Sequence, residues 1–218
     1  MCPSRSLSAA VGIALIALIG LAAPPAWAGA PTDQVKASVD RIIGVLQDPA
    51  LKLESRAKDR RTAIRGTASQ IFDFEETAKR AMGRHWQQLS DQERAEFVPL
   101  FADLLERAYI SKIEQYSGEK INYVGESVDP AGDIATVKTS FTTKKGQDVP
   151  IEYHLHRRGD RWAIYDVFIE GVSLVSNYRT QFDKIIQTSS YQELVKKMRT
   201  GAAEIPAPGA SPKGKGRS

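Results

Sequence analysis

The stretch RWAIYDVFIEGVSLVSNYR, residues 161–179, decides the fold. After Arg161, residues 162–169 are apolar at both odd and even positions apart from Asp166, which is typical of a strand covered on both faces. Gly171 closes the strand, and from Leu174 onward the apolar residues recur at helical spacing. The stretch therefore joins a sheet directly to a helix, and we expect both to belong to one domain.

Three more strands are expected upstream of this stretch. From Lys120 onward the apolar residues alternate with polar ones, which is the period of a half-buried strand. Turn residues separate the runs at 129–133, 145–147 and 158–160. Four strands joined by short turns predict an antiparallel meander.

Helical periodicity precedes and follows these strands. Thr32 is expected to cap the first helix, which Pro49 stops. Asp73 and Ser90 are each followed three residues later by Glu, so each predicts a capping box. Pro99 lies inside the long helix after Ser90 and is expected to kink or restart it. The predicted fold class is α+β, a four-stranded antiparallel meander sheet packed with several helices.

The N-terminal segment is typical of a secretory signal peptide. Arg5 gives it a positive start, residues 9–23 are apolar, and residues 26–28 have the small-x-small pattern of a cleavage site. The apolar run is short for a membrane span, which needs about 20 residues, although an uncleaved anchor is the alternative. We predict export and cleavage near Ala28. The expected organisation is a signal peptide at 1–28, a domain at 29–205 and a disordered tail rich in Pro, Gly and Lys at 206–218.

Charge and cysteine usage exclude several classes of function. The chain has 30 Lys and Arg against 26 Asp and Glu. The surplus corresponds to Arg5 in the signal peptide and to Lys213, Lys215 and Arg217 in the tail, so the part between is neutral and gives no argument for nucleic acid. The single cysteine, Cys2, precedes the apolar run. Disulfides, thiol catalysis and thiolate metal sites are therefore excluded for the exported chain.

The sequence contains no strong catalytic or metal-binding motif, such as G-x-S-x-G or H-E-x-x-H. His154 and His156 lie two apart on a predicted strand, so both should point to the face opposite Tyr153 and Leu155. A metal pair is conceivable there, but no third ligand is placed by spacing. A solvated strand face is the favoured interpretation, and the lack of motifs favours binding over catalysis.

Asp166 interrupts the apolar strand. Strict alternation places it on one face with Trp162, Ile164 and Phe168, where it should be partly buried and need a partner. One interpretation is a general base in a cone-shaped pocket. The favoured one is a structural hydrogen bond to a neighbouring helix or to Arg179.

Large apolar side chains come from the helix at 97–113, from the strands and from the segment at 169–182. All three can face one space. Periodicity cannot distinguish a filled core from a hollow one, so both interpretations stay open.

Residues 162–179 strongly resemble the signature of the MlaC-like family, periplasmic lipid-binding proteins also called the toluene-tolerance or organic-solvent-resistance auxiliary family. The specific element is Tyr-Asp-x-x-x-Glu-Gly-Val-Ser, residues 165–173. Phe72-Asp73-Phe74, the segment 83–86 and Tyr116-Ser117-Gly118 also match in order. The similarity covers roughly residues 32–199.

The resemblance implies a soluble periplasmic carrier, not an enzyme, that holds phospholipid acyl chains in a deep apolar pocket between sheet and helices. Its implied partners are phospholipid, an inner-membrane MCE-domain/ABC transporter complex and an outer-membrane lipoprotein–porin complex. No cofactor, metal or nucleic acid is implied. The lipid-binding residues carried over from the pocket-facing segments are Phe101, Leu105, Tyr109, Val137, Phe141, Ile151, Tyr153, Tyr165, Val167, Ile169, Val172 and Val175.

Three alternatives remain. The same pocket could carry another apolar cargo, such as a hopanoid or an aromatic solvent. A small cone-fold enzyme could use Asp166 as its base, and an interaction module with a filled core would bind no ligand at all. The basic face at residues 56–65 suits docking on an acidic surface, but a solvated helix face is the favoured interpretation.

Overall fold

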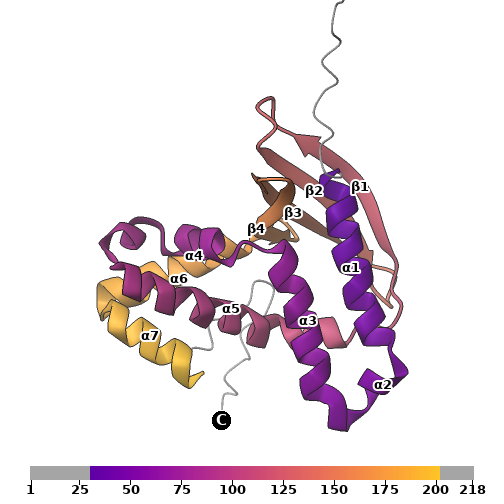
Figure 1. Cartoon of the computed structure of the whole chain (residues 1–218), viewed down its shortest axis with the longest axis horizontal. Coiled ribbons are helices and arrows are strands. Elements are labelled where there is room, and N and C mark those ends of the chain that lie inside the picture. Colours follow the sequence, from indigo (N-terminus) through magenta and orange to yellow (C-terminus); the bar gives the residue numbers. More distant parts are fainter. Residues whose placement is uncertain (1–29, 202–218) are drawn as a thin grey trace, which may run out of the picture.

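The computed structural model describes residues 30–201, and the predicted signal peptide and C-terminal tail lie outside the described residues. In this part of the chain a group of helices precedes the strands and a second group follows them (Figure 1). The helices are α1 (Pro31–Gln47), α2 (Pro49–Lys52), η1 (Glu54–Arg56), α3 (Ala57–Ile71), α4 (Phe74–Met82), η2 (Gly83–Gln88), α5 (Asp91–Glu114), α6 (Leu174–Thr188) and α7 (Tyr191–Thr200). The strands are β1 (Ile121–Val128), β2 (Ile134–Thr142), β3 (Asp148–Arg158), β4 (Arg161–Ile169) and β5 (Val172–Ser173).

The strands form an antiparallel meander in the order β1-β2-β3-β4-β5, so the predicted α+β fold is confirmed. The described sheet has five strands where the sequence predicted four. The addition is the short β5, which pairs with the end of β4 through a two-residue turn. Both turn residues, Glu170 and Gly171, have positive φ (51° and 78°), as tight hairpin turns require.

A bulge at Tyr165 changes which side chains share a face of β4. Leu155 pairs with Ile164 but His154 pairs with Asp166, so Tyr165 is an extra residue without a partner on β3. The alternation therefore shifts by one after Ile164. The prediction that Asp166 shares a face with Ile164 is wrong for this reason.

Each face of β4 is covered by different helices. Trp162 and Ile164, before the bulge, and Val167 and Ile169, after it, all belong to one apolar cluster with residues of α1 and α3. On the opposite face Tyr165 contacts Arg80 of α4. The prediction that this strand is covered on both sides is confirmed.

Several helix boundaries follow from their caps. Asp73 accepts a hydrogen bond from the Glu76 amide, and Ser90 forms a full capping box with Glu93. Thr32 is not a cap, because α1 already begins at Pro31. The prediction that the helix restarts at Pro99 is also wrong, since α5 runs through this residue as one helix.

The basic stretch before residue 72 divides into α2, η1 and α3, and its arginines connect α3 to α5. Arg60 and Arg61 both pair with Glu114, and Arg65 pairs with Asp103 and Glu106. Burial alone would raise the pKa of Glu114, but the Arg61 and Arg60 guanidinium groups outweigh it and hold the pKa below its usual value. Most arginines of this basic face therefore form ion pairs within the fold. The face is neither the docking surface nor the solvated helix face that the two sequence interpretations described.

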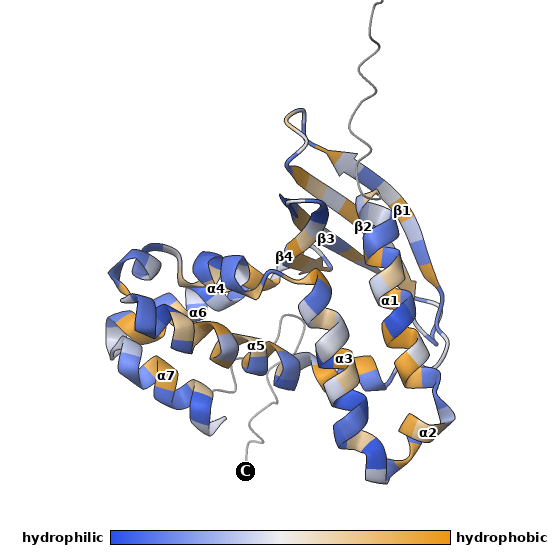
Figure 2. Ribbon diagram, viewed as in Figure 1, coloured by the Kyte–Doolittle hydropathy of each residue, from blue (hydrophilic) through white to orange (hydrophobic). Residues whose placement is uncertain are grey.

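The apolar interior forms three separate clusters. Figure 2 shows the apolar residues that supply them alternating with polar residues along strands and helices. The helical cluster joins α4 to α7 and centres on Phe97, Phe101, Tyr178 and Phe182. The sheet cluster joins the strands to α1 and α3 and includes Val35, Ile71, Ala135, Val137, Leu155, Trp162, Ile164 and Val167. The third, the α1–α3–α5 cluster, consists of Leu46, Ile64 and Ile110 with Ile42, Val45, Ile113 and Tyr116 packed against them.

Candidate functional site

The sheet presents one continuous apolar face to the helices. Cross-strand pairing aligns Ala135 with Leu155 and Ile164 in one row, and all three side chains are buried. The next row aligns Val137, Tyr153 and Val167. Val35 of α1 and Ile71 of α3 close over this end of the face. This part of the sheet is an ordinary packed core.

The other end of the same face is covered less completely. Ile121, Phe141, Ile151 and Ile169 lie there, and each is only partly buried. We call these four residues the half-buried end. Large apolar side chains that remain partly accessible on one face form a surface suited to an apolar ligand.

The loops at the half-buried end carry three lysines, with the acidic residues Glu119, Asp148 and Glu170 beside them. The β2–β3 hairpin lies here and places the exposed Lys144 and Lys145 at its tip. Lys120 precedes β1, and its carbonyl accepts a hydrogen bond from the Thr142 amide beside them. Lysines beside an apolar surface are the arrangement expected where an apolar ligand has a negatively charged head group.

The twelve residues predicted to bind lipid do not all lie in one place. Val137, Ile151, Tyr153, Val167 and Ile169 belong to the sheet cluster, and Phe141 shares their face. Their role in binding remains a prediction.

The other predicted residues lie elsewhere. Phe101, Leu105 and Val175 are in the helical cluster. Tyr165 is on the opposite face of β4, with the Arg80 guanidinium 4.0 Å from its ring centroid, and Val172 is 46% exposed beside the β4–β5 turn. Tyr109 belongs to none of the three clusters of the described chain. The structure thus brings together the sheet residues but not the helical ones.

Three tyrosine hydroxyls are buried within the apolar interior. The hydroxyls of Tyr109, Tyr123 and Tyr178 have no hydrogen-bond partner among residues 30–201. Burial raises the pKa of Tyr178 to about 12 and raises the pKa of Tyr109 and Tyr123 still further. All three are therefore neutral hydrogen-bond donors at physiological pH.

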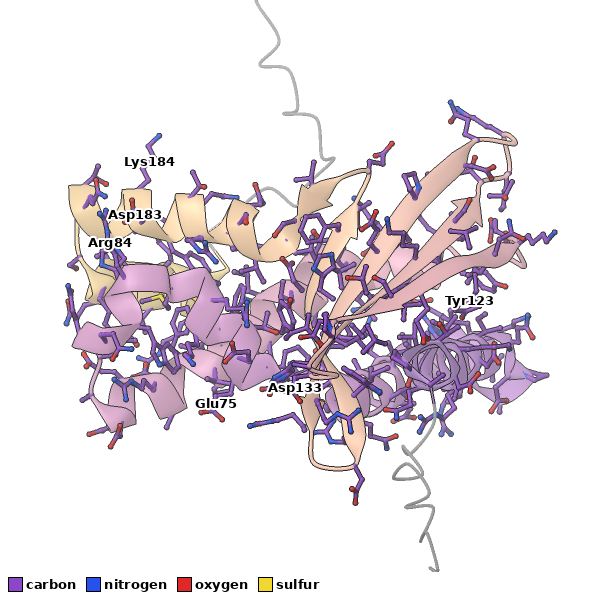
Figure 3. The ribbon with its side chains drawn as sticks, turned by 90° about the horizontal axis from the view of Figure 1, so that it is seen from above. Glu75, Arg84, Tyr123, Asp133, Asp183 and Lys184 are labelled. Atoms are coloured by element: carbon purple, nitrogen blue, oxygen red, sulfur yellow. The ribbon has the colours of Figure 1, made fainter. Side chains whose placement is uncertain are left out.

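Sequence reasoning missed Tyr123 and Tyr178 as candidate functional residues. Tyr178 lies one helical turn after Leu174, so its spacing is that of an ordinary core residue. Tyr123 occupies an apolar position of β1, and Figure 3 places it where the sheet meets the helices seen end-on. Only the lack of a partner for their hydroxyls distinguishes these tyrosines, and a sequence does not contain that signal.

Asp166 has a structural role. Its carboxylate accepts hydrogen bonds from the amides of Val167 (2.8 Å) and Val175 (3.1 Å) and from the Ser173 hydroxyl (2.6 Å). The carboxylate therefore joins β4 to the start of α6, as the favoured interpretation expected, whereas Arg179 instead donates to the Arg80 carbonyl. Both carboxylate oxygens are thus engaged within the fold.

The two strand histidines are packed and are not simply solvated. The ring of His154 stacks on Phe168 with centroids 4.4 Å apart. His156 Nε2 lies 3.0 Å from Asp73 Oδ2, and Arg158 Nε lies 2.9 Å from the same oxygen. The prediction of a solvated face is wrong, because Phe168 packs on His154 and Asp73, the residue before α4, contacts His156. Within the described residues no group of three or more His, Cys, Asp or Glu side chains is arranged to hold a metal ion.

A second polar cluster lies at the helical end of the molecule. Asp183 Oδ1 accepts from Arg84 and lies 2.7 Å from His85 Nε2, and Figure 3 shows Arg84 and Asp183 side by side. Hydrogen bonds from His85 and Arg84 lower the pKa of Asp183. This cluster fixes η2 to α6 and is distant from the half-buried end.

These features define a class of protein: an α+β domain whose meander sheet presents an apolar face to the helices. That face is closed at one end and half-buried at the other. None of the helices in residues 30–201 is long and apolar enough to cross a membrane. The chain belongs to the MlaC protein family, whose match covers residues 36–200. The resemblance found in residues 162–179 is therefore confirmed.

Named relatives are similar over most of the chain. The intermembrane phospholipid transport system binding protein MlaC of Haemophilus influenzae is 21% identical over 170 residues, which cover 77% of this chain and 79% of the relative. The toluene tolerance protein Ttg2D of Pseudomonas putida is 24% identical over 180 residues, covering 80% and 81%.

A solved structure shares the fold. The phospholipid-binding protein of Ralstonia solanacearum, solved in complex with a phospholipid, superposes with a TM-score of 0.67 at 22% identity. The match covers 81% of this chain and 99% of that protein.

Proposed function

We propose that this protein is a periplasmic carrier that binds phospholipid by its acyl chains and shuttles it between the outer-membrane lipoprotein–porin complex and the inner-membrane MCE-domain/ABC transporter complex. The acyl chains lie along the apolar face of the sheet. The head group lies at the half-buried end, near Lys120, Lys144 and Lys145.

The observation that carries this proposal is the gradient of burial along one sheet face. Ala135, Leu155 and Ile164 are fully packed, whereas the apolar side chains two or three rows away remain partly accessible. Such a face binds an apolar chain from one end while the packed end holds the fold together. The family match and the phospholipid in the complex of the Ralstonia protein support phospholipid as the cargo.

The energetics suit a carrier. Two acyl chains hold about 30 methylenes, and removing them from water is worth about 0.8 kcal/mol each, or roughly 24 kcal/mol in all. A bilayer provides nearly the same free energy. The protein therefore needs only an apolar site that is comparable to membrane, and the direction of transport must come from its partners.

The test is native mass spectrometry of the exported, purified protein, followed by organic extraction and identification of the released lipid. We expect a stoichiometric adduct that releases diacyl phospholipid. Release of a hopanoid or an aromatic solvent would retain the carrier and replace its cargo. A bare protein mass that persists after incubation with phospholipid vesicles would contradict lipid carriage.

A further inference from the structure

The contact between α3 and α5, which we call the α3–α5 seam, combines little apolar packing with much charge. The buried side chains that these two helices give to the α1–α3–α5 cluster are Ile64 and Ile110. Four ion pairs join the same two helices, and each runs from an arginine of α3 to a carboxylate of α5. Water and counterions can replace an ion pair, but they cannot replace apolar packing. The seam can therefore part with little loss of apolar contact.

Glu114, the last residue of α5, is the centre of this seam. Arg60 Nη2 lies 2.8 Å from its Oε1 and Arg61 Nη2 lies 3.0 Å from its Oε2, so both carboxylate oxygens are engaged. The side chains of Glu114 and Arg60 are only 14% and 12% exposed, so solvent screens this pair less than a surface pair. Arg60 also donates to the Leu51 carbonyl of α2 over 2.7 Å. One carboxylate thus holds the end of α5 to α3 and, through Arg60, to α2.

The seam borders the half-buried end of the sheet. Residues 115–120 connect Glu114 to Ile121, which begins β1 and belongs to the half-buried end. Along α1, Val39 packs on the sheet cluster, and Ile42, about one turn later, packs on the α1–α3–α5 cluster, so these two clusters are neighbours. Figure 1 shows α5 passing α3 on its way to β1. An apolar ligand on the half-buried end therefore lies next to the seam.

We propose that the α3–α5 seam opens for phospholipid to enter and leave, and that Glu114 is the positioning residue that holds it closed. This inference rests on the proposed function and adds where the cargo passes. The carboxylate does not have to contact the lipid. It sets the population of the closed arrangement, and lipid exchange proceeds through the open one. Loss of its ion pairs shifts this equilibrium toward the open arrangement and speeds exchange.

The first test compares two carboxylates that each hold two basic side chains in different parts of the molecule. Glu114→Gln removes the charge at the seam, and Asp183→Asn removes the charge that Arg84 and His85 share at the helical end. The two variants change the net charge equally, and both should have a lower Tm. Only Glu114→Gln should speed the uptake of fluorescent phospholipid from phosphatidylcholine vesicles, by about fivefold or more.

The second test closes the seam covalently, so that it does not depend on a weakened fold. The single cysteine of the chain is Cys2, within the predicted signal peptide, so an introduced pair can be cross-linked selectively. Arg61→Cys with Glu114→Cys, joined by a short bis-methanethiosulfonate, should slow uptake and release by about tenfold or more. Reduction of the cross-link should restore both rates. Arg84→Cys with Asp183→Cys, joined by the same reagent, is the control and should leave the rates unchanged.

The outcomes separate this inference from the proposed function. Equal effects of Glu114→Gln and Asp183→Asn on uptake would mean that the seam does not govern exchange, which overturns the inference. Undiminished exchange in the cross-linked Arg61→Cys, Glu114→Cys protein overturns it as well, whether or not Glu114→Gln folds. In both cases lipid uptake by the unaltered protein leaves the carrier function intact. An unaltered protein that takes up no phospholipid overturns the carrier function and the inference with it.

Discussion

At the scale of single residues, Asp73 shows how one residue joins three elements through its carboxylate and its backbone amide. One oxygen caps α4 by accepting from the Glu76 amide, and the other contacts His156 and Arg158 of β3. Its own amide donates to the Ile164 carbonyl of β4. Burial alone would raise the pKa of Asp73, but the Glu76 amide, Arg158 and His156 outweigh it, so the pKa lies below its usual value.

The low pKa of Asp73 predicts acid-sensitive stability. Its folded pKa is below the unfolded value of about 3.9, so its contribution is complete above that pH and is lost as the pH falls through the folded pKa. Asp73→Asn keeps a capping oxygen but loses the charge, and should cost roughly 2 kcal/mol at neutral pH. Urea unfolding measured from pH 7 to pH 3 should also show a shallower loss of stability in this variant.

Asp91→Asn is the control for this experiment, since the Asp91 side chain is fully exposed at 100%. It should leave the pH dependence unchanged. Identical pH profiles for Asp73→Asn and the unaltered protein would show that the buried cluster contributes nothing to acid sensitivity.

At the scale of elements, local signals predicted the structure wherever neighbours in sequence determine it. The Ser90 capping box, the turns and the meander depend on adjacent residues, and all were predicted. The bulge at Tyr165 was not, because alternation along a strand gives no sign of an extra residue. The bulge lets Asp166 reach Ser173 and the Val175 amide, seven and nine residues further along the chain. It also turns Asp166 away from the face of Ile164.

The candidate site was predictable only in part, because the sequence shows which side chains point inward but not which cluster each of them joins. Alternation selected the sheet residues Val137, Ile151, Val167 and Ile169, even though the bulge intervenes. It could not separate Phe101 or Val175, which pack in the helical cluster, from residues facing the sheet. Helical spacing shows that a side chain points inward, but the cluster it joins depends on how the helices are arranged.

The half-buried end predicts how a charge in the sheet should act on lipid content. If acyl chains lie on this face as proposed, Ile151→Glu puts a carboxylate among them, which is costly to bury, and should lower co-purified lipid by about tenfold or more. The side chain is partly accessible, so the lipid-free variant should still fold. Extraction and quantification of phosphate per protein measure the effect.

Val124→Glu provides the matched control. Val124 lies at the bulge of edge strand β1 and is 64% exposed, so the same substitution should leave lipid content unchanged. Equal lipid content in folded Ile151→Glu and Val124→Glu proteins would remove Ile151 from the binding surface.

At the scale of the whole molecule, the sheet and the helical cluster lie at opposite ends (Figures 1 and 3). The helical cluster is a packed unit of aromatic side chains, such as Phe97 and Phe182 with ring centroids 5.7 Å apart. The half-buried apolar residues and the lysines of the β2–β3 hairpin are at the sheet end. Under the proposed function, the helical end maintains the fold and the sheet end meets the membrane or partner that exchanges lipid.

This polarity predicts which lysines affect lipid exchange. Lys144 is exposed at the hairpin tip, and each basic residue near an anionic bilayer contributes about 1 kcal/mol to association. Lys144→Glu should therefore slow the transfer of fluorescent phospholipid from anionic vesicles by at least about fivefold at low salt. Lys184→Glu, at the helical end in Figure 3, makes the same charge change and should leave the rate unaltered. Because salt screens exposed charges, the difference should vanish at about 1 M salt and with zwitterionic vesicles. Equal slowing by the two substitutions would mean that net charge, and not the sheet end, governs the encounter with the membrane.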